Sequence, residues 1–356
     1  MNIKERFYEI DLFRFIAAIG VVFFHYTFRG YAADEMSILS FPVLGEIFKY
    51  GYLGVNLFFI ISGFVILLTA QNRNIIEFIV SRITRLYPAF WIGVTLTALV
   101  TLIIGGTRYH IELTQYLANL SMISGYFGIK AVDGVYWTLL VELKFYFLII
   151  ILLFFNQIKN IKYYLFAWLI ISLLSLYINI PSKIEFFLLT KWSSYFIAGA
   201  FFYLIRKDGF SLLYLAGIFL SYYISIKHAY WRIHGLNEHY QTEFSPFIVI
   251  GIISVFYIIM FLVSIKKTKL LNKKTMLHFG ILTYPLYLIH QNIGFMLFNY
   301  FGNDNNKYIL LLITIFIMIL LAYIISKYYE KKIAIKLKTM LLNLFESIKH
   351  LTIKIK

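Results

Sequence analysis

Residues 308–326 read YILLLITIFIMILLAYIIS, a run without a single charged side chain. A bilayer core about 30 Å thick requires roughly 20 apolar residues in a helix that crosses it. The whole chain of 356 residues has this character: 61% of its residues are hydrophobic, 14% are charged, and its mean hydropathy is +0.77. A water-soluble protein is roughly 45–50% apolar and about 25% charged. The sequence therefore predicts an all-α, polytopic membrane protein.

Ten apolar stretches are candidate transmembrane helices, and polar connections rich in Gly, Pro, Asn and charged residues separate them. We treat residues 1–326 as one transmembrane domain and residues 327–356 as a basic tail. The predicted spans are residues 10–28, 51–71, 88–106, 134–155, 164–180, 191–205, 210–226, 246–264, 279–298 and 308–326.

The distribution of Lys and Arg predicts the orientation of these helices. If residues 1–9 lie inside, the inside segments hold 22 of these residues, the outside segments hold nine, and Arg14 and Lys144 lie within spans. Cytoplasmic loops carry such an excess, so both termini are predicted to be cytoplasmic. The same bias accounts for much of the net charge of +16 without a nucleic-acid partner. The chain has no cysteine, which excludes disulfides and thiolate metal sites.

The tail after Ser326 alternates Lys with Ile, Leu and Phe. This pattern is typical of a basic amphipathic helix that lies on the anionic inner leaflet. A docking site for a partner enzyme is the alternative interpretation.

The first predicted span carries three ionisable residues, Asp11, Arg14 and His25. Such side chains are costly in lipid and often mark functional sites. Asp11 and Arg14 are three residues apart, so they share a helix face and can pair. Arg14 and His25 are separated by about three helical turns, or roughly 16 Å, and therefore project from nearly the same stripe. A structural ion pair and a hydrogen-bonding histidine are the simpler readings of these residues.

Glu142 lies in the fourth predicted span, about 12 Å below its outer edge, near the depth expected for His25. A carboxylate and an imidazole at one depth can form a hydrogen-bonded pair in which the acid sets the ring tautomer. We therefore predict a His25–Glu142 pair. Neutralisation of Lys144 is the competing role for Glu142, but residues two apart on a helix point in different directions.

Further candidates lie at the predicted cytoplasmic boundary and near mid-membrane. Arg82 and Arg85 occupy the first predicted cytoplasmic loop, where they are either membrane anchors or a grip for phosphate oxygens. His290 lies in the ninth span, near mid-membrane. The pair Ser62 and Gly63 in the second span predicts a notch for helix packing.

Several segments follow one another in a recognisable order. They are Arg14 and His25 with ten residues between them, GVNLFFIISGF at 54–64, Arg82-x-x-Arg85, Tyr136-Trp137-Thr-Leu-x-Val-Glu142, Tyr284-Pro285-Leu-Tyr287-Leu-Ile-His290-Gln291 and Tyr329-Glu330-Lys331. Together they resemble acyltransferase family 3, membrane acyltransferases that modify bacterial surface polysaccharides among other acceptors. The resemblance covers about residues 8–332. Asn56 stands where the family often has Asp, and Thr138 where it often has Ser.

The resemblance implies transfer of an acyl group, most simply acetyl, from acetyl-CoA to a hydroxyl of a cell-surface polysaccharide or its lipid-linked precursor at the bacterial inner membrane. Arg82 and Arg85 would bind the CoA phosphates, with Arg14 near the thioester arm. His25 would act as a general base or carry the acyl group transiently, and Glu142 would orient it. The supporting residues are Asp11, Tyr136, Trp137 and His290.

Acyl-CoA, a glycan acceptor and membrane lipids are thus the expected partners; no metal is expected, and a homo-oligomer is compatible with the sequence. A flippase or transporter of lipid-linked glycans is the main alternative, and it would not consume acetyl-CoA. A glycan polymerase is less suited, since it needs basic outside loops and these are poor in Lys and Arg. The longest of them, 227–245, holds His228, His234 and His239, which are candidates for contact with the acceptor.

Overall fold

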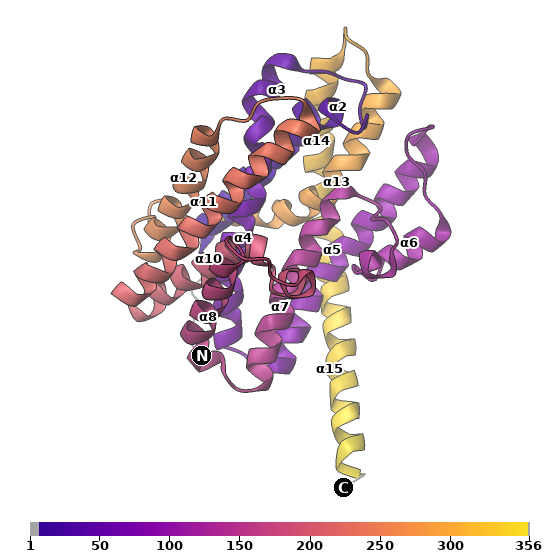
Figure 1. Ribbon diagram of the computed structural model, residues 1–356. Coiled ribbons are helices and arrows are strands. Elements are labelled where there is room, and N and C mark those ends of the chain that lie inside the picture. Colours follow the sequence, from indigo (N-terminus) through magenta and orange to yellow (C-terminus); the bar gives the residue numbers. More distant parts are fainter. Residues whose placement is uncertain (1–6, 355–356) are drawn as a thin grey trace.

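The computed structural model describes residues 7–354, which form helices and connecting turns without any strand. The helices are α1 (Tyr8–Phe24), α2 (Gly30–Ala32), α3 (Pro42–Phe48), α4 (Gly54–Gln71), α5 (Ile75–Ile104), α6 (Leu113–Asn119), α7 (Trp137–Phe154), α8 (Ile161–Leu174), α9 (Ser182–Leu188), α10 (Thr190–Asp208), α11 (Leu212–Tyr240), α12 (Pro246–Ser264), α13 (Leu277–Phe301), α14 (Lys307–Ile324) and α15 (Lys331–Lys354). The long helices stand side by side in one bundle (Figure 1). The predicted all-α fold is confirmed.

Eight helical segments of the described chain are long and apolar enough to cross a membrane. Two of the ten predicted spans are not among them. One corresponds to α8, which has only 14 residues. The other corresponds to α13, which has 25 residues but includes His290, Gln291 and Asn292. The chain is thus a multi-pass membrane protein, whereas the span count of ten and the cytoplasmic termini stay predictions.

Contacts between segments that are far apart in the sequence show which connecting turns lie at the same end of the bundle. At one end, which we call the inner end, the Tyr8 amide donates to Asn272 Oδ1 at 2.9 Å, and Arg206 Nη1 donates to the Val263 carbonyl at 3.1 Å. Tyr8, Asn272 and Arg206 come from segments predicted to lie inside, and Val263 lies at the adjoining end of the predicted span 246–264.

At the opposite, outer end, four segments predicted to lie outside meet in the same way. Tyr109 Oη and Asn299 Nδ2 both donate to the Met36 carbonyl, at 2.8 and 2.9 Å, and Lys49 Nζ donates to the Glu243 carbonyl at 3.0 Å. The loops grouped together by their Lys and Arg content are therefore also the loops that contact one another at each end.

Two helices extend beyond their predicted limits. Residues 82–88, expected in a loop, lie inside α5, which begins after an Asn74–Glu77 capping box in which each side chain bonds the other's backbone. Residues 227–240, expected in an outside loop, are part of α11. Both predictions were wrong because polar residues at helix ends outside the lipid were mistaken for loop residues.

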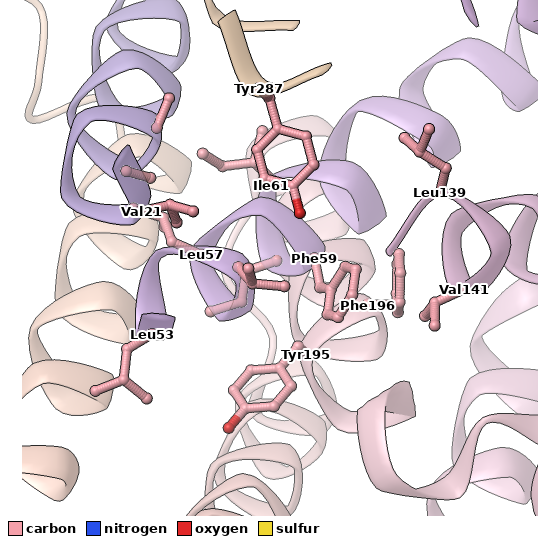
Figure 2. Packing of buried hydrophobic residues seen from close by; sticks show 14 of the residues in the cluster. Val21, Leu53, Leu57, Phe59, Ile61, Leu139, Val141, Tyr195, Phe196 and Tyr287 are labelled. Atoms are coloured by element: carbon pink, nitrogen blue, oxygen red, sulfur yellow. The ribbon is translucent and has the colours of Figure 1, made fainter. Parts of the chain in front are cut away.

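The centre of the bundle is a close contact between α4 and α10. A Cβ atom added at Gly63 would collide with the Phe196 carbonyl, and one added at Gly199 would collide with the Ile60 carbonyl. The predicted packing notch at Gly63 is therefore confirmed. Phe196 stacks on Phe59 with ring centroids 4.7 Å apart, and Figure 2 shows these two rings beside each other.

Substitution of Gly199 by Ala is expected to lower the thermal unfolding temperature of the detergent-solubilised protein. The new methyl group would push α4 and α10 apart, and overpacking of this kind costs about 1–3 kcal/mol. Gly251→Ala on α12 is the matched control, because a Cβ there meets nothing within 4 Å. Equal unfolding temperatures for the two variants would contradict the close contact.

The tail forms α15, joined to α14 by a π-helical segment, Ile325–Glu330. Part of α15 contacts α5, and its far end extends away from the body of the bundle (Figure 1). Its position on the inner leaflet stays a prediction.

Candidate active site

Three of the predicted arginines line a cavity of about 180 Å³ that we call the inner cavity. Arg14 reaches it from α1, and Arg82 and Arg85 reach it from the first turns of α5. Glu142 of α7 completes the charged part of its wall. The fold therefore brings together charged residues from three helices, α1, α5 and α7.

The three arginines of the inner cavity differ in how their charge is balanced. Arg85 Nη1 pairs with Glu330 Oε1 at 2.9 Å, which gives the acidic residue of the Tyr329-Glu330-Lys331 element a structural role. Arg82 packs over the Phe78 and Tyr146 rings and bonds only to the neighbouring Ser81 hydroxyl among the described residues. Arg14 has no hydrogen bond or salt bridge within the described chain, although Glu142 and Asp11 attract it electrostatically. The cavity thus keeps positive charge for an anionic ligand.

The predicted hydrogen bond between His25 and Glu142 is wrong. Glu142 Oε1 accepts from the hydroxyls of Ser62 and Tyr146, both at 2.6 Å, and His25 bonds instead to His290. The reason lies in the arrangement of the helices: α1 is packed against α4 and α13, while α7 contacts α4 and α5. Two side chains at the same depth can thus lie between different helices and never meet.

His25 begins a π-helical segment, His25–Arg29, that interrupts the first transmembrane helix. Such segments are rare and occur frequently at functional sites. The side chain is buried, and its Nδ1 lies 2.9 Å from His290 Nε2.

The surroundings of His290 determine the tautomer of His25. His290 Nδ1 lies 2.8 Å from the Tyr287 carbonyl and 3.2 Å from the Leu286 carbonyl. Carbonyl oxygens only accept, so His290 Nδ1 carries its proton and its Nε2 accepts when the ring is neutral. His25 Nδ1 must then donate to His290, which leaves the lone pair of a neutral His25 on Nε2. His290 therefore has the orienting role that was expected of Glu142.

Two buried contacts hold His290 in place. Tyr26 Oη donates to the His290 carbonyl at 2.7 Å. Asp133, just before α7, accepts from the Asn292 and Val135 amides at 2.9 and 3.1 Å and so ties the start of α7 to α13. Burial raises the pKa of the Asp133 carboxyl to about 6, while these two amide bonds favour its charged form.

His25 lines a second, central cavity of about 90 Å³. Val55 and Tyr287 belong to both the central and the inner cavity and form the wall between them. The Tyr287 hydroxyl lies 2.9 Å from Thr138 Oγ1, and Figure 2 shows its ring reaching from α13 toward α4. An imidazole and a cluster of guanidinium groups therefore lie on either side of one tyrosine.

The remaining predicted residues lie around these cavities. Tyr136 Oη donates to the Leu288 carbonyl at 3.3 Å, and so braces α13 near His290. Trp137 lines the central cavity and a third, outer one. Asp11 lies against Gly280 of α13, where an added Cβ would collide with its carboxylate. The described residues include no group of three or more His, Cys, Asp or Glu that could hold a metal ion.

Three residues that contribute to the site were not predicted from the sequence as part of it. Ser62 and Tyr146 both donate to Glu142, and Asp133 accepts from the Asn292 amide two residues after His290. The spacing of four residues between Glu142 and Tyr146 could have indicated their bond. For Asp133 the signal was its position before a helix, typical of an N-cap.

Comparison with known proteins identifies the family of the chain. The family model of the acyltransferase domain matches residues 7–327. Nodulation protein 10 of Rhizobium leguminosarum bv. viciae is 29% identical over 158 residues, and the match covers 39% of this chain and 42% of that protein. No solved structure matches the chain. The chain therefore belongs to acyltransferase family 3 and is a multi-pass membrane protein.

Proposed function

We propose that the protein transfers an acyl group, most simply acetyl, from acyl-CoA to a hydroxyl of a cell-surface glycan or its lipid-linked precursor in the bacterial inner membrane. The observation that best supports this proposal is the common wall of the two cavities. The inner cavity holds three guanidinium groups, and the central cavity holds His25. A CoA thioester needs both environments, because its phosphates and its reacting carbonyl lie at opposite ends of a long arm.

The inner cavity suits the phosphate-bearing end of the donor. Guanidinium groups match phosphate oxygens in geometry and charge, and two of the three, Arg14 and Arg82, lack an acidic hydrogen-bond partner among the described residues. The positive-inside distribution supports a cytoplasmic location for this end, where acyl-CoA is found. Glu142, held by Ser62 and Tyr146, is a positioning residue that keeps Arg14 directed into the cavity.

His25 supplies the proton transfer. Its Nε2 takes the proton of the acceptor hydroxyl while the hydroxyl oxygen attacks the thioester carbonyl carbon. The carbon–sulfur bond then breaks, and the imidazolium returns the proton to the departing thiolate. The His290 bond to Nδ1–H stabilises the imidazolium formed on the way. In the alternative with a transient acyl-histidine, Nε2 attacks the thioester carbonyl carbon and the CoA thiolate leaves. The hydroxyl oxygen then attacks the acyl carbon, the bond from that carbon to Nε2 breaks, and the hydroxyl proton passes to the CoA thiolate.

Arg82→Gln is expected to raise the KM for acetyl-CoA about tenfold, with little change in kcat, because one charged contact with phosphate is worth about 1.4 kcal/mol or more. Arg73→Gln is the matched control, since Arg73 does not line the inner cavity. Initial rates at varied acetyl-CoA give both constants. An unchanged KM in the Arg82 variant would leave this arginine as a membrane anchor.

The function itself is tested with purified full-length protein and [14C]acetyl-CoA. De-O-acetylated envelope glycan from the producing cells serves as acceptor, and label in the glycan together with release of CoA is the expected result. A flippase would leave acetyl-CoA intact. Intact acetyl-CoA in the presence of this glycan would thus contradict the proposal.

A further inference from the structure

The largest of the three cavities, about 610 Å³, lies beside the central cavity, near the outer ends of α7 and α10. This outer cavity shares Tyr52, Trp137 and Arg232 with the central cavity that contains His25. Ligand pockets commonly have volumes of about 300–1,000 Å³. An acceptor in the outer cavity would therefore reach the imidazole from the side opposite the inner cavity.

Positive charge in the outer cavity has no acidic counterpart. Arg232 and Lys191 line it, and none of the described lining residues of the outer or the central cavity is Asp or Glu. The Arg232 guanidinium lies 5.0 Å from the Trp192 ring centroid and 5.4 Å from that of Tyr52. Arg232 has no hydrogen bond or salt bridge within the described chain, so its N–H donors are available to a ligand.

A third cation, Arg29, adds positive charge beside Arg232 and Lys191. Arg29 lines the central cavity, and its nearest carboxylate, Asp34, lies at 4.0 Å, the limit for an ion pair. Its Nε is buried without an acceptor. A buried donor without a partner is costly, and an anion in these cavities would reduce that cost.

The uncharged part of the outer cavity suits a sugar ring. Trp137, Trp192 and Trp231 line it, and flat aromatic surfaces make favourable dispersion contacts with the apolar C–H faces of a pyranose. Asn56 is only 3% exposed, and its Nδ2 donates to Tyr195 while its Oδ1 has no partner. A neutral amide can accept from a sugar hydroxyl without repelling an anion.

We propose that the acceptor is an anionic glycan, a sugar that carries a carboxylate or phosphate group close to the hydroxyl that is acylated. Its acidic group binds Arg232 and Lys191, its ring stacks on the tryptophans, and its hydroxyl reaches toward His25. This inference rests on the proposed function and specifies its acceptor class.

The test uses purified full-length protein, [14C]acetyl-CoA and two acceptor pools. Envelope glycans of the producing cells are de-O-acetylated with mild base and separated by anion exchange into neutral and acidic pools. Label is expected to enter the acidic pool at least about tenfold faster than the neutral one, equivalent to one charged contact. Arg232→Gln should lower labelling of the acidic pool by about the same factor, and Arg232→Lys should lower it less.

Lys227→Gln is the matched control, because Lys227 lies on the same helix, α11, and lines none of the three cavities. Its labelling rate should equal that of the unchanged protein. Reduction of carboxyl groups and, separately, removal of phosphate from the acidic pool show which group is bound, since only one treatment should abolish the preference.

The outcomes separate this inference from the proposed function. Equal or faster labelling of the neutral pool, or no effect of Arg232→Gln, would overturn the anionic acceptor while acyl transfer stands. Label in neither pool would overturn the proposed function and this inference with it.

Discussion

Replacement of His25 by Ala is expected to lower kcat for acyl transfer by about 100- to 10,000-fold, the usual contribution of a positioned acid–base group. The reason is the Nε2 lone pair of His25, which lines the central cavity and for which the alanine methyl is no substitute. The KM for acetyl-CoA should change little, because the arginines of the inner cavity are untouched. Label transferred from [14C]acetyl-CoA to envelope glycan measures both constants.

His110→Ala is the control for this variant. His110 is an exposed histidine that lines none of the three cavities, so its loss should leave transfer unchanged. Membrane level and unfolding temperature of both variants establish that they are folded. Transfer by the His25 variant at a rate near that of the unchanged protein would remove the imidazole from the mechanism.

Replacement of His290 by Leu is expected to lower kcat by about 10- to 100-fold. The bond from His25 Nδ1 becomes charge-assisted when the imidazolium forms, and such a bond is worth about 1.5–3 kcal/mol, or tenfold in rate for each 1.36 kcal/mol. Leucine cannot accept this bond. Without it, the His25 ring is free to adopt the tautomer in which Nε2 is protonated and no longer basic.

His290→Gln distinguishes orientation of His25 from a general packing role. A glutamine side-chain oxygen can accept from His25 Nδ1, so this variant should recover part of the lost kcat, whereas leucine should not. Equal activities for the two variants would contradict the assigned tautomer.

The membrane architecture could be predicted because it depends on chain-wide properties. Apolar runs have to be helical in lipid, since every backbone polar group needs a partner there. Lys and Arg counts then grouped the loops, and contacts such as Tyr8 with Asn272 and Tyr109 with Met36 show the same grouping. The ends of the helices were harder to predict, because α5 and α11 continue past the apolar residues that mark each span.

The site was predicted only in part. Depth along a helix can be counted from the sequence, and it placed His25 and Glu142 at similar levels. Lateral position cannot be counted, and it depends on which helices are neighbours. Because α4 and α13 are the principal neighbours of α1, the partner of His25 is His290, and Glu142 belongs to the inner cavity. The π-helical segment at His25 likewise has no simple sequence signal.

The mechanism proposed above requires donor and acceptor to reach His25 from opposite ends of the bundle. Proteoliposomes with the protein in one orientation, [14C]acetyl-CoA on one side and de-O-acetylated glycan on the other test this most directly. Label should reach the glycan only when acetyl-CoA is on the side of Arg82 and Arg85 and the glycan is on the side of Arg232. Transfer between substrates confined to the same side, at a rate equal to transfer across the membrane, would contradict it.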